Sequence, residues 1–524
     1  MELATAAEMR EMDRRTIEDF GIPGRVLMET AARGAVSVLL KLFPGAASRR
    51  IGVMAGKGNN GGDGFVMARC LKQMGAEATV YLLARAQEIS GDAAANLALL
   101  PKMGVPVTEI PDSDSFGRAR PGMEWCDLWI DAILGTGLNS EVRGLYRDAI
   151  LFLNEARGPV FSVDVPSGLF SDTGAAPLCV RADATATFGL PKIGQWVYPG
   201  ASFRGVLEVV DIGIPRHVVE AVNPRHFLAD ESWARGILKP RKPTAHKGDA
   251  GHLLVVAGSP GKTGAAFMAS HAALRAGAGL VTLAAPTTVS GVLEGRVTEA
   301  MTEALPASSS GGLSEAAFEP VMRLLEGKRA LALGPGMGTD PETVRLVRRL
   351  VVESPVPVVA DADALNALAW DASLLKNARS AVILTPHPGE MSRLSGRSTA
   401  EIQADRIGSA RAFSETHGVW LVLKGAHTVS ASPDGRAGIV ASGNPGMASG
   451  GMGDVLTGVT GALLVQGYGP DEAATLGAYL HGLSADILAA GGSPVGYLAS
   501  EVADALPRAV SRCLAPHPDG GPKP

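Results

Sequence analysis

The sequence is poor in cysteine and in aromatic residues. Its 524 residues include four cysteines, and no two of them form a Cys-x-x-Cys pair, so the sequence gives no basis for a zinc site or a disulfide framework. Aromatic residues make up only 5 % of the chain, whereas hydrophobic residues make up 46 % and glycine occurs 65 times. This composition argues against long disordered segments and is typical of closely packed helices and sheets with glycine-lined loops.

Long apolar runs and blocks of basic charge are also missing. No apolar stretch approaches the roughly 20 residues that cross a bilayer, and the first residues mix charges early, unlike the apolar core of a signal peptide. Lysine and arginine total 48 against 53 acidic residues, a net charge of −5, and the densest basic stretch is Lys239–Lys242. We therefore expect a cytoplasmic chain that binds neither nucleic acid nor a membrane.

Two blocks of alternating strands and helices follow one another along the chain. Six short apolar runs predict buried strands in the first block: Ile51–Ala55, Thr79–Leu83, Leu128–Leu134, Val160–Val165, Ala184–Phe188 and Val206–Val210. Six more predict strands in the second: His252–Ala257, Leu280–Ala284, Ala330–Leu333, Val356–Ala360, Ala381–Leu384 and Trp420–Leu423. Helices are expected at Ala4–Phe20, Arg25–Leu42, Gly64–Met74 and Arg143–Glu155. Such alternation indicates an α/β protein with parallel sheets covered by helices on both faces.

The boundary between the blocks falls in a polar stretch punctuated by proline. The alternation lapses after Asp211–Pro215, and residues 240–249 have the composition of a linker. We expect one domain at residues 1–223, a linker at 224–241, a second domain at 242–515 and a frayed tail at 516–524.

A glycine-rich turn, Ala55-Gly-Lys-Gly-Asn-Asn-Gly-Gly-Asp-Gly64, follows the first strand. Gly56, Gly58 and Gly61 satisfy G-x-G-x-x-G, a motif whose glycines admit a pyrophosphate to a helix N-terminus. No acid closes the next strand, so an ordinary dehydrogenase is only weakly supported. Three more oxygen-rich loops follow strands: Asp131–Leu138, Asp164–Gly168 and Gly189–Lys192. Because ligands bind at this edge of open parallel sheets, several such loops favour a ligand or cation site over simple helix caps.

The stretch Ser442–Gly458 carries the clearest catalytic pattern of the second block. It is rich in glycine and brings Asp454 to the start of an apolar helical pattern. Amides at a helix start stabilise phosphoryl charge, and Asp454 is placed to take a proton from a hydroxyl that attacks phosphorus, with a helix cap as the alternative. By contrast, Gly258–Thr263 is not a Walker A loop, because the first glycine of that motif would fall at Val256.

Three other loops of the second block follow strands. Asp361–Leu365 offers two acids, Thr385–Glu390 an imidazole and a carboxylate, and Lys424–Thr428 a cation and a hydroxyl suited to phosphates. Mg²⁺ prefers few carboxylates together with phosphate oxygens, so Glu390 or Asp361 is a candidate to approach it through water.

These motifs resemble those of the bifunctional NAD(P)H-hydrate repair enzymes. Ala55–Phe65 and Asp164–Leu169 resemble their N-terminal epimerase domain, a Rossmann-like fold, over about Met1–Asn223. Six motifs in order resemble their ADP-dependent dehydratase domain, a ribokinase-like fold, over about Lys242–Ala515: Gly264–Ala266, Gly334–Gly338, Asp361–Asn366, Thr385–Glu390, Lys424–Thr428 and Gly450–Asp454. The resemblance implies two three-layer αβα domains that repair hydrated NADH and NADPH. The first would interconvert the R and S hydrates, and the second would dehydrate the S hydrate with ADP, giving AMP and phosphate.

In the first domain the resemblance implies a role for specific residues. The hydrate would be bound by Asn59, Asn60, Gly61, Gly62, Asp63, Gly135, Thr136, Gly137, Leu138, Asn139, Ser140, Glu141 and Asp164. Asp164 is also the expected catalytic acid or base, and Asn60, Asp131 and Ser167 would hold a potassium ion. One departure is Thr30, which stands where the family usually has Asn after Glu.

In the second domain the resemblance implies a hydrate site and a nucleotide site. Ala266, Gly338, His387 and Asp454 would contact the hydrate, with Asp454 catalytic. The adenine nucleotide would be bound by Lys424, Gly425, Ala426, His427, Thr428 and Gly453. Glu390 stands where related kinases place an acid associated with Mg²⁺. The expected ligands are therefore K⁺, Mg²⁺, ADP and the hydrated dinucleotides, and a homo-oligomer is left open.

Three alternatives stay open from the residues alone. A small-molecule kinase of the ribokinase class, acting on a vitamin alcohol, would share Gly453 and Asp454 but leaves Asn59–Asp63 unexplained. In a second alternative the first domain is a ligand-sensing or partner-binding module. The third is a dehydrogenase built on Gly56–Gly61 that transfers hydride to an alcohol or keto substrate.

Overall fold

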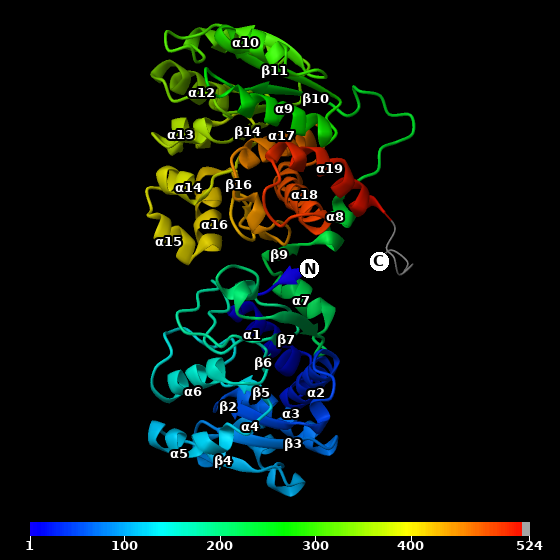
Figure 1. Cartoon of the computed structure of the whole chain (residues 1–524), viewed down its shortest axis with the longest axis vertical. Helices are drawn as coiled ribbons and strands as arrows, with labels where there is room; N and C mark the ends of the chain where they lie inside the picture. The colour runs from blue at the N-terminus through cyan, green and yellow to red at the C-terminus, as the bar shows by residue number, and fades with distance from the viewer. Residues whose placement is uncertain (516–524) are drawn as a thin grey trace. The chain divides into compact units, whose positions relative to one another are not determined.

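The computed structural model describes residues 1–515, and the chain divides into two compact units, Glu2–His226 and Phe227 onwards with Met1. The N-terminal unit runs from blue to green in Figure 1 and the C-terminal unit from green to red. Within the described residues no helix is both long and apolar enough to cross a membrane. The tail predicted at 516–524 lies outside the described residues.

The N-terminal unit is built on seven parallel strands in the order β4-β3-β2-β5-β6-β7-β8. They are β2 (Arg50–Ala55), β3 (Glu77–Leu82), β4 (Val107–Glu109), β5 (Leu128–Ala132), β6 (Val160–Val163), β7 (Ala184–Phe188) and β8 (Val206–Val210). The strand order reverses between β2 and β5. In an open sheet this reversal opens a crevice at the carboxyl ends of the strands, which is where ligands bind.

Helices cover both faces of this sheet. On one face lie α2 (Gly24–Leu42), α3 (Asn59–Gln73) and α4 (Gly91–Leu97), and on the other α5 (Ser113–Met123) and α6 (Gly144–Glu155). Side chains alternate along each strand, so Val53 and Ala55 pack with α2 and α3 while Met54 packs on the opposite face. Helix α1 (Ala6–Arg14) continues into a π-helical turn, Arg15–Asp19, and packs with α7 (Arg216–Val222).

The C-terminal unit has a longer sheet, in the order β9-β18-β17-β16-β15-β14-β13-β10-β11-β12. The strands are β9 (His226–Ala229), β10 (His252–Val256), β11 (Leu280–Pro286), β12 (Met301–Leu305), β13 (Ala330–Leu333), β14 (Val358–Ala360), β15 (Val382–Leu384), β16 (Trp420–Leu423), β17 (Val429–Ala431) and β18 (Ala437–Val440). Neighbours from β16 to β12 are parallel, whereas β16, β17 and β18 are antiparallel.

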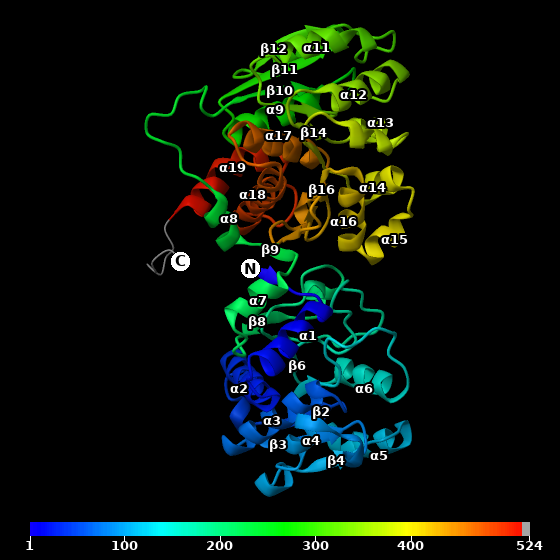
Figure 2. The ribbon, with the colours of Figure 1, turned by 180° about the vertical axis from the view of Figure 1, so that it is seen from behind.

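Helices also cover both faces of the second sheet, as both views show (Figures 1 and 2). One face carries α9 (Thr263–Arg275), α17 (Met452–Val465), α18 (Pro470–Gly491) and α19 (Ala499–Leu514), beside α8 (Glu231–Ile237). The other carries α12 (Pro341–Glu353), α13 (Asp363–Leu368), α14 (Pro388–Ser395) and α16 (Arg406–His417). The remaining helices are α10 (Thr287–Glu294), α11 (Phe318–Leu324) and α15 (Thr399–Ala404).

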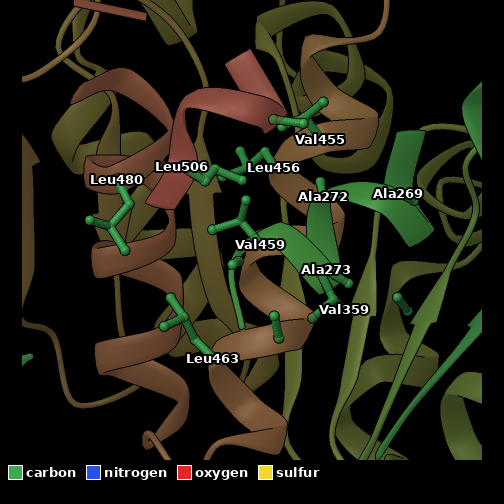
Figure 3. Packing of buried hydrophobic residues seen from close by; sticks show 14 of the residues in the cluster. Ala269, Ala272, Ala273, Val359, Val455, Leu456, Val459, Leu463, Leu480 and Leu506 are labelled. Carbon is green, nitrogen blue, oxygen red and sulfur yellow. The ribbon is translucent and has the colours of Figure 1, made fainter. Parts of the chain in front are cut away.

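Small residues bring α9 and α17 into close contact. In Figure 3, Ala269, Ala272 and Ala273 of α9 lie beside the apolar side chains of α17. A Cβ atom at Gly458 would lie only 2.1 Å from the backbone oxygen of Ala269, so the two helix backbones touch. This packing fixes the N-terminal end of α17, which carries Asp454.

The α/β class is confirmed, and the twelve predicted strands lie within two residues of the strands in the structure. Three features differ. Helix α3 begins at Asn59 and not at Gly64, since the glycines form its first turns instead of a loop. The predicted runs omit β4 and β12, most of whose residues are partly or fully exposed, and also the short hairpin β17–β18. Residues 224–241, expected as a linker, contain β9 and α8.

Candidate active sites

A cavity of about 610 Å³ lies at the carboxyl edge of the N-terminal sheet. Its wall includes nine of the residues predicted to bind the hydrate: Asn59, Asn60, Asp63, Gly135, Thr136, Gly137, Leu138, Asn139 and Asp164. Ser140 and Glu141 are exposed farther along the loop and do not line this cavity. Thr30 does not line it either, and its hydroxyl donates a hydrogen bond to the backbone oxygen of Val26.

Close packing explains three glycines of the first turn, Gly56, Gly61 and Gly62. A Cβ atom at Gly56 would lie 2.0 Å from the backbone oxygen of Ile133, and one at Gly61 would lie 2.0 Å from that of Gly56. At Gly62 it would lie 2.7 Å from the methyl carbon of Met28. Gly56, Gly61 and Gly62 therefore serve the close approach of α3 to its neighbours, whereas a Cβ atom at Gly58 would meet nothing within 4 Å.

Asp131 lies near the carboxyl end of β5 and is completely buried. The Ser162 hydroxyl and the Ser167 backbone N–H each donate to it at 2.8 Å, and the Ser167 hydroxyl donates to its other oxygen. Burial raises the pKa of Asp131 against these hydrogen bonds. In the described part of the chain no ion pair offsets its charge. Asn60 is buried too, and neither its amide oxygen nor its amide nitrogen has a hydrogen-bond partner among the described residues.

Asp164 follows β6 in a left-handed conformation, with φ of 64°. One oxygen of its carboxylate accepts hydrogen bonds from the Lys192 ammonium, from the Thr187 hydroxyl and from the Phe188 backbone N–H. The Lys192 side chain is only 1 % exposed and also donates to Thr187 Oγ1 and to the Phe188 backbone oxygen. Asp164 thus lies in an ion pair with a buried lysine. The sequence reasoning named the loop that contains Lys192 but not this ion pair.

Two further acids reach the same cavity, Asp63 of α3 and Asp13 of α1. Burial, reinforced by Asp164 and Asp13 and opposed by Lys192, raises the pKa of Asp63 well above its ordinary value. Burial also raises the pKa of Asp13 to about 6. Sequence reasoning missed Asp13. The available signal was its spacing of four residues from Met9, which places both on the inward face of one helix.

In the C-terminal unit, Lys424 lies among acidic side chains. Its ammonium is 2.8 Å from Asp361 and 3.6 Å from Glu390. Burial alone would raise the pKa of Asp361, but the charge of Lys424 outweighs it and lowers that pKa. The Thr457 hydroxyl donates to the second oxygen of Asp361 at 3.0 Å, which ties this group to α17.

Asp454 lies in the first turn of α17, at the N-terminal end of the helix. Burial raises the pKa of Asp454 to about 7, Asp361 adds to the rise, and Lys424 opposes it. A Cβ atom at the neighbouring Gly453 would lie 3.0 Å from the Asp361 carboxylate and 3.2 Å from the Lys424 ammonium. The predicted base and the predicted nucleotide residues Lys424 and Gly453 are therefore close together. A carboxyl group with this pKa is suited to general base chemistry near neutral pH.

His387 caps the N-terminus of α14. Its Nδ1 accepts hydrogen bonds from the backbone N–H groups of Gly389 and Glu390 at 3.0 and 3.3 Å. With Nδ1 accepting, Nε2 is the ring nitrogen that can donate, and it lies 3.5 Å from the Glu390 carboxylate. The Glu390 carboxylate accepts in turn from the His387 backbone N–H at 2.8 Å, which closes a capping box.

The loops around Gly338 and Ala266 lie beside one another. One oxygen of Asp363 accepts from the Gly338 backbone N–H at 2.8 Å and from the Lys262 ammonium at 3.0 Å. Ala266 is in the first turns of α9, which begins directly after Lys262. Ala362, between the two acids of its loop, has a φ of 51°, a strained value of the kind that gathers at functional sites.

The predicted nucleotide loop Lys424–Thr428 is supported from below by a residue that the sequence reasoning missed. The Arg406 guanidinium is largely buried and donates to four backbone oxygens: those of Leu423, Lys424, Ala426 and His427. The Thr428 hydroxyl donates to the Gly425 backbone oxygen at 3.0 Å. Arg406 precedes the loop in sequence and lies on another element, so no local pattern marks it.

Comparison with known families gives two matches along the chain. Residues 24–194 match the model described as YjeF-related protein N-terminus, and residues 253–508 match the model described as NAD(P)H-hydrate dehydratase.

Relatives match over almost the whole length. The bifunctional NAD(P)H-hydrate repair enzyme Nnr of Moorella thermoacetica is 46 % identical over 509 residues, covering 97 % of this chain and 96 % of the relative. The enzyme of the same name from Escherichia coli is 37 % identical over 511 residues, covering 97 % and 93 %. Among solved structures, the ADP/ATP-dependent NAD(P)H-hydrate dehydratase of Bacillus subtilis, co-crystallised with ATP and Mg²⁺, is 31 % identical and covers 55 % of this chain and 98 % of its own, with a TM-score of 0.48.

The order of the two matched regions is the order of the two units in the structure. Both relatives carry the same name, and each matches 97 % of this chain, so the similarity extends over both units. The chain therefore belongs to the family of bifunctional NAD(P)H-hydrate repair enzymes, with an N-terminal epimerase unit and a C-terminal dehydratase unit.

Proposed function

We propose that the chain restores hydrated NADH and NADPH in two stages. The N-terminal unit interconverts the R and S hydrates, and the C-terminal unit dehydrates the S hydrate at the expense of ADP. The observation that supports the second stage best is Asp454, a carboxyl with a pKa of about 7 at a helix N-terminus beside a lysine. We place the protein in the cytoplasm on the basis of its composition.

Dehydration begins with a proton transfer to Asp454. Its carboxylate takes the proton of the C6 hydroxyl, and the hydroxyl oxygen attacks the β-phosphorus of ADP. The bond from that phosphorus to the bridging oxygen breaks, and AMP leaves with the electron pair. The C6–O bond then breaks as the ring nitrogen supplies its electron pair, which releases phosphate. Loss of a C5 proton restores the dihydronicotinamide. Phosphorylation serves this chemistry because phosphate leaves far more readily than hydroxide.

The polar groups around Asp454 divide between the two substrates. Lys424–Thr428 and Gly453 bind the nucleotide, where the Lys424 ammonium offsets phosphoryl charge. Ala266, Gly338 and His387 bind the hydrate, and His387 donates from Nε2. The strongest support for this division is that Lys424 and Gly453, both assigned to the nucleotide, lie close to Asp454.

A Mg²⁺ ion bound with the nucleotide would offset phosphate charge, and Glu390 and Asp361 are the acids that could hold it through water. Glu390 contacts Lys424 and the backbone of His387, which leaves it suited to reach the ion through water and not as a direct ligand. We propose ADP as the nucleotide because of the family resemblance. ATP is the alternative, and comparing recovery with each nucleotide distinguishes them.

The N-terminal unit suits a potassium ion. Among the described residues, no three or more His, Cys, Asp or Glu side chains cluster in a way that could hold a metal ion. The described residues of the unit therefore offer no site of several acidic ligands. Asn60, Asp131 and Ser167 instead offer one charge and neutral oxygens, and the buried Asp131 lacks a counter-charge while the buried Asn60 amide lacks partners. We propose that these three residues hold K⁺, which offsets the charge of Asp131 and orders the loop that begins at Leu134.

The hydrate lies in the cavity above this site. Asn59–Asp63 of α3, the loop Gly135–Asn139 and Asp164 bind it, with Gly61 and Gly62 acting by letting α3 approach. Since its carboxylate is paired with Lys192, Asp164 contributes a fixed negative charge more readily than a mobile proton.

The test mixes the purified protein with both epimers of hydrated NADH and adds ADP or ATP. Absorbance of reduced nicotinamide should return with ADP, and AMP and phosphate should appear in equal amounts. Recovery with ATP but not ADP would revise the nucleotide. No return with either nucleotide would contradict the proposed function.

A further inference from the structure

Asp13 differs from the other charged residues of its helix. Glu11 pairs with Arg14 and Arg15, and Arg14 also reaches Glu18 and Asp19, all on the outer side of the helix and its π-helical extension. Asp13 forms no ion pair and no hydrogen bond with any described residue. It lines the cavity of the N-terminal unit, on the face that carries the buried Met9.

The start of α1 is fastened to the loop that carries Lys192. The Ala4 backbone N–H donates to the Pro191 oxygen at 3.0 Å, and the Ile193 N–H donates to the Ala4 oxygen at 3.3 Å. At the helix start the Ala6 N–H donates to the Asp172 carboxylate at 2.6 Å, and Thr5 forms a capping box with Glu8. Asp13 is therefore held in place relative to Lys192 and Asp164.

The cavity holds more carboxyl groups than cations to pair with them. Asp13, Asp63 and Asp164 face a single buried cation, Lys192, and the three protons of that ammonium are taken by Asp164, Thr187 and the Phe188 oxygen. The other titratable side chains of the wall are Arg10, Lys57, Asp92 and Tyr146. Because like charges in one site repel one another, at least one of these carboxyl groups tends to keep its proton. Burial also raises the pKa of both Asp13 and Asp63.

We propose that Asp13 and Asp63 are the pair of carboxyl groups that transfer protons in the epimerase. Asp164 keeps its negative charge throughout and stabilises the cation that forms on the ring. This inference rests on the proposed function of the N-terminal unit. The two carboxyls come from different helices, α1 and α3, and line one cavity, which is the arrangement needed to act on two faces of one ring carbon.

The reaction is an exchange of water at C6. The protonated carboxyl of the pair gives its proton to the C6 hydroxyl, the C6–O bond breaks, and water leaves while the ring nitrogen lone pair forms the N1=C6 double bond. The Asp164 carboxylate stabilises the resulting cation. Water then adds to the opposite face, its proton passes to the second carboxylate of the pair, and the N1=C6 electrons return to nitrogen. Proton, water and charge are all restored, with the two carboxyls having exchanged roles.

The full chain reports both of its activities in one assay. With mixed hydrates and excess ADP, the S hydrate should be recovered in a fast phase and the R hydrate in a slow phase limited by epimerisation. In D13N the fast phase should be unchanged and the slow phase should fall by about 10²-fold or to the uncatalysed exchange rate. D63N should behave in the same way. E11Q, on the outer face of the same helix, should leave both phases unchanged, and an unaltered thermal transition of D13N excludes misfolding.

Two outcomes separate the inference from its premise. A slow phase in D13N equal to that of the wild type would overturn the role of Asp13 and leave the proposed function standing. A wild-type slow phase equal to the enzyme-free rate would overturn the proposed function itself.

A second measurement does not depend on how the variants fold. Epimerisation of the R hydrate by the wild type, without nucleotide and in water labelled with heavy oxygen, should place the label at C6 in step with inversion. Inversion without label would overturn the C6–O cleavage step.

Discussion

Each unit of the molecule places one lysine among several carboxylates, but the two lysines are held differently. Lys192 of the N-terminal unit is 1 % exposed, and its three donated hydrogen bonds go to groups of the protein. Lys424 of the C-terminal unit is 21 % exposed and contacts two carboxylates, of which only Asp361 lies within 3 Å. A saturated ammonium fixes a neighbouring anion, whereas one with spare donors can bind a ligand.

This difference fits the two chemistries. Phosphoryl transfer needs a cation that reaches the incoming phosphate, and we propose that Lys424, which lies near the start of α17, supplies it. Epimerisation transfers no phosphate, and in our proposal its lysine serves to hold Asp164 in an ion pair. The proton-carrying groups that we propose are carboxyls that form no ion pair with any described residue, Asp454 in one unit and Asp13 with Asp63 in the other.

The largest contrast between the units should come from D454N. Removing the proposed general base should lower ADP-dependent recovery of the S hydrate by about 10²–10⁴-fold. Interconversion of the R and S hydrates, followed by chromatography without nucleotide, should continue at the wild-type rate. Equal loss of both activities would show that the two sites are not separable.

A smaller effect is expected from K424M. Without the ammonium, the nucleotide loses a phosphate contact and Asp454 loses the charge that opposes its raised pKa. We expect kcat/KM for ADP to fall by about 10²-fold, and the acid limb of the pH–rate profile to move to higher pH. A fall in kcat/KM with an unmoved limb would place Lys424 away from Asp454 in the working enzyme.

The pH profile of dehydration tests the same carboxyl in the wild type. The pKa of Asp454, about 7, is above its ordinary value, so the group is mostly protonated, and inactive as a base, below that pH. The rate should therefore rise about tenfold per pH unit up to about 7 and then level off. Burial raises this pKa most, Asp361, Asp363 and Glu390 add to the rise, and Lys424 opposes it. A rate that stays constant from pH 5 to pH 8, as roughly expected of an ordinary aspartate, would contradict it.

Two glycines allow a matched test of packing in the N-terminal unit. A methyl group at Gly56 would lie 2.0 Å from the Ile133 oxygen, whereas one at Gly58 would meet nothing within 4 Å. G56A should destabilise this unit by about 1–3 kcal/mol, measured by thermal unfolding. G58A should have a clearly smaller effect, and similar shifts for both would show that close approach does not explain the motif.

The smallest effect is that of potassium. Replacing K⁺ by choline should remove about 1 kcal/mol of stability from the N-terminal unit, since the ion binds the folded state. Dehydration of the S hydrate should not change. In D131N the unfolding temperature should no longer depend on K⁺, and a dependence that persists would place the ion elsewhere.

Much of this fold can be predicted because its strands are buried on both faces and read as short apolar runs. Asp454 can also be predicted from the sequence, because a single acid at the end of a glycine-rich run is a local pattern. Asp13 and Arg406 are different, because each lies on a helix and reaches its site only through tertiary packing. Helix α3 begins at Asn59, earlier than predicted, because the close approach of Gly61, Gly62 and Gly64 to neighbouring atoms favours glycines that isolated helices disfavour.

The most direct test of the two-site account uses the R hydrate of NADH alone. With ADP, the wild-type chain should return all of the reduced-nicotinamide absorbance, since the N-terminal unit supplies the S hydrate that the C-terminal unit consumes. D454N should return none while still forming the S hydrate. Full return by D454N, or a wild-type return no faster than the uncatalysed epimerisation allows, would contradict the account.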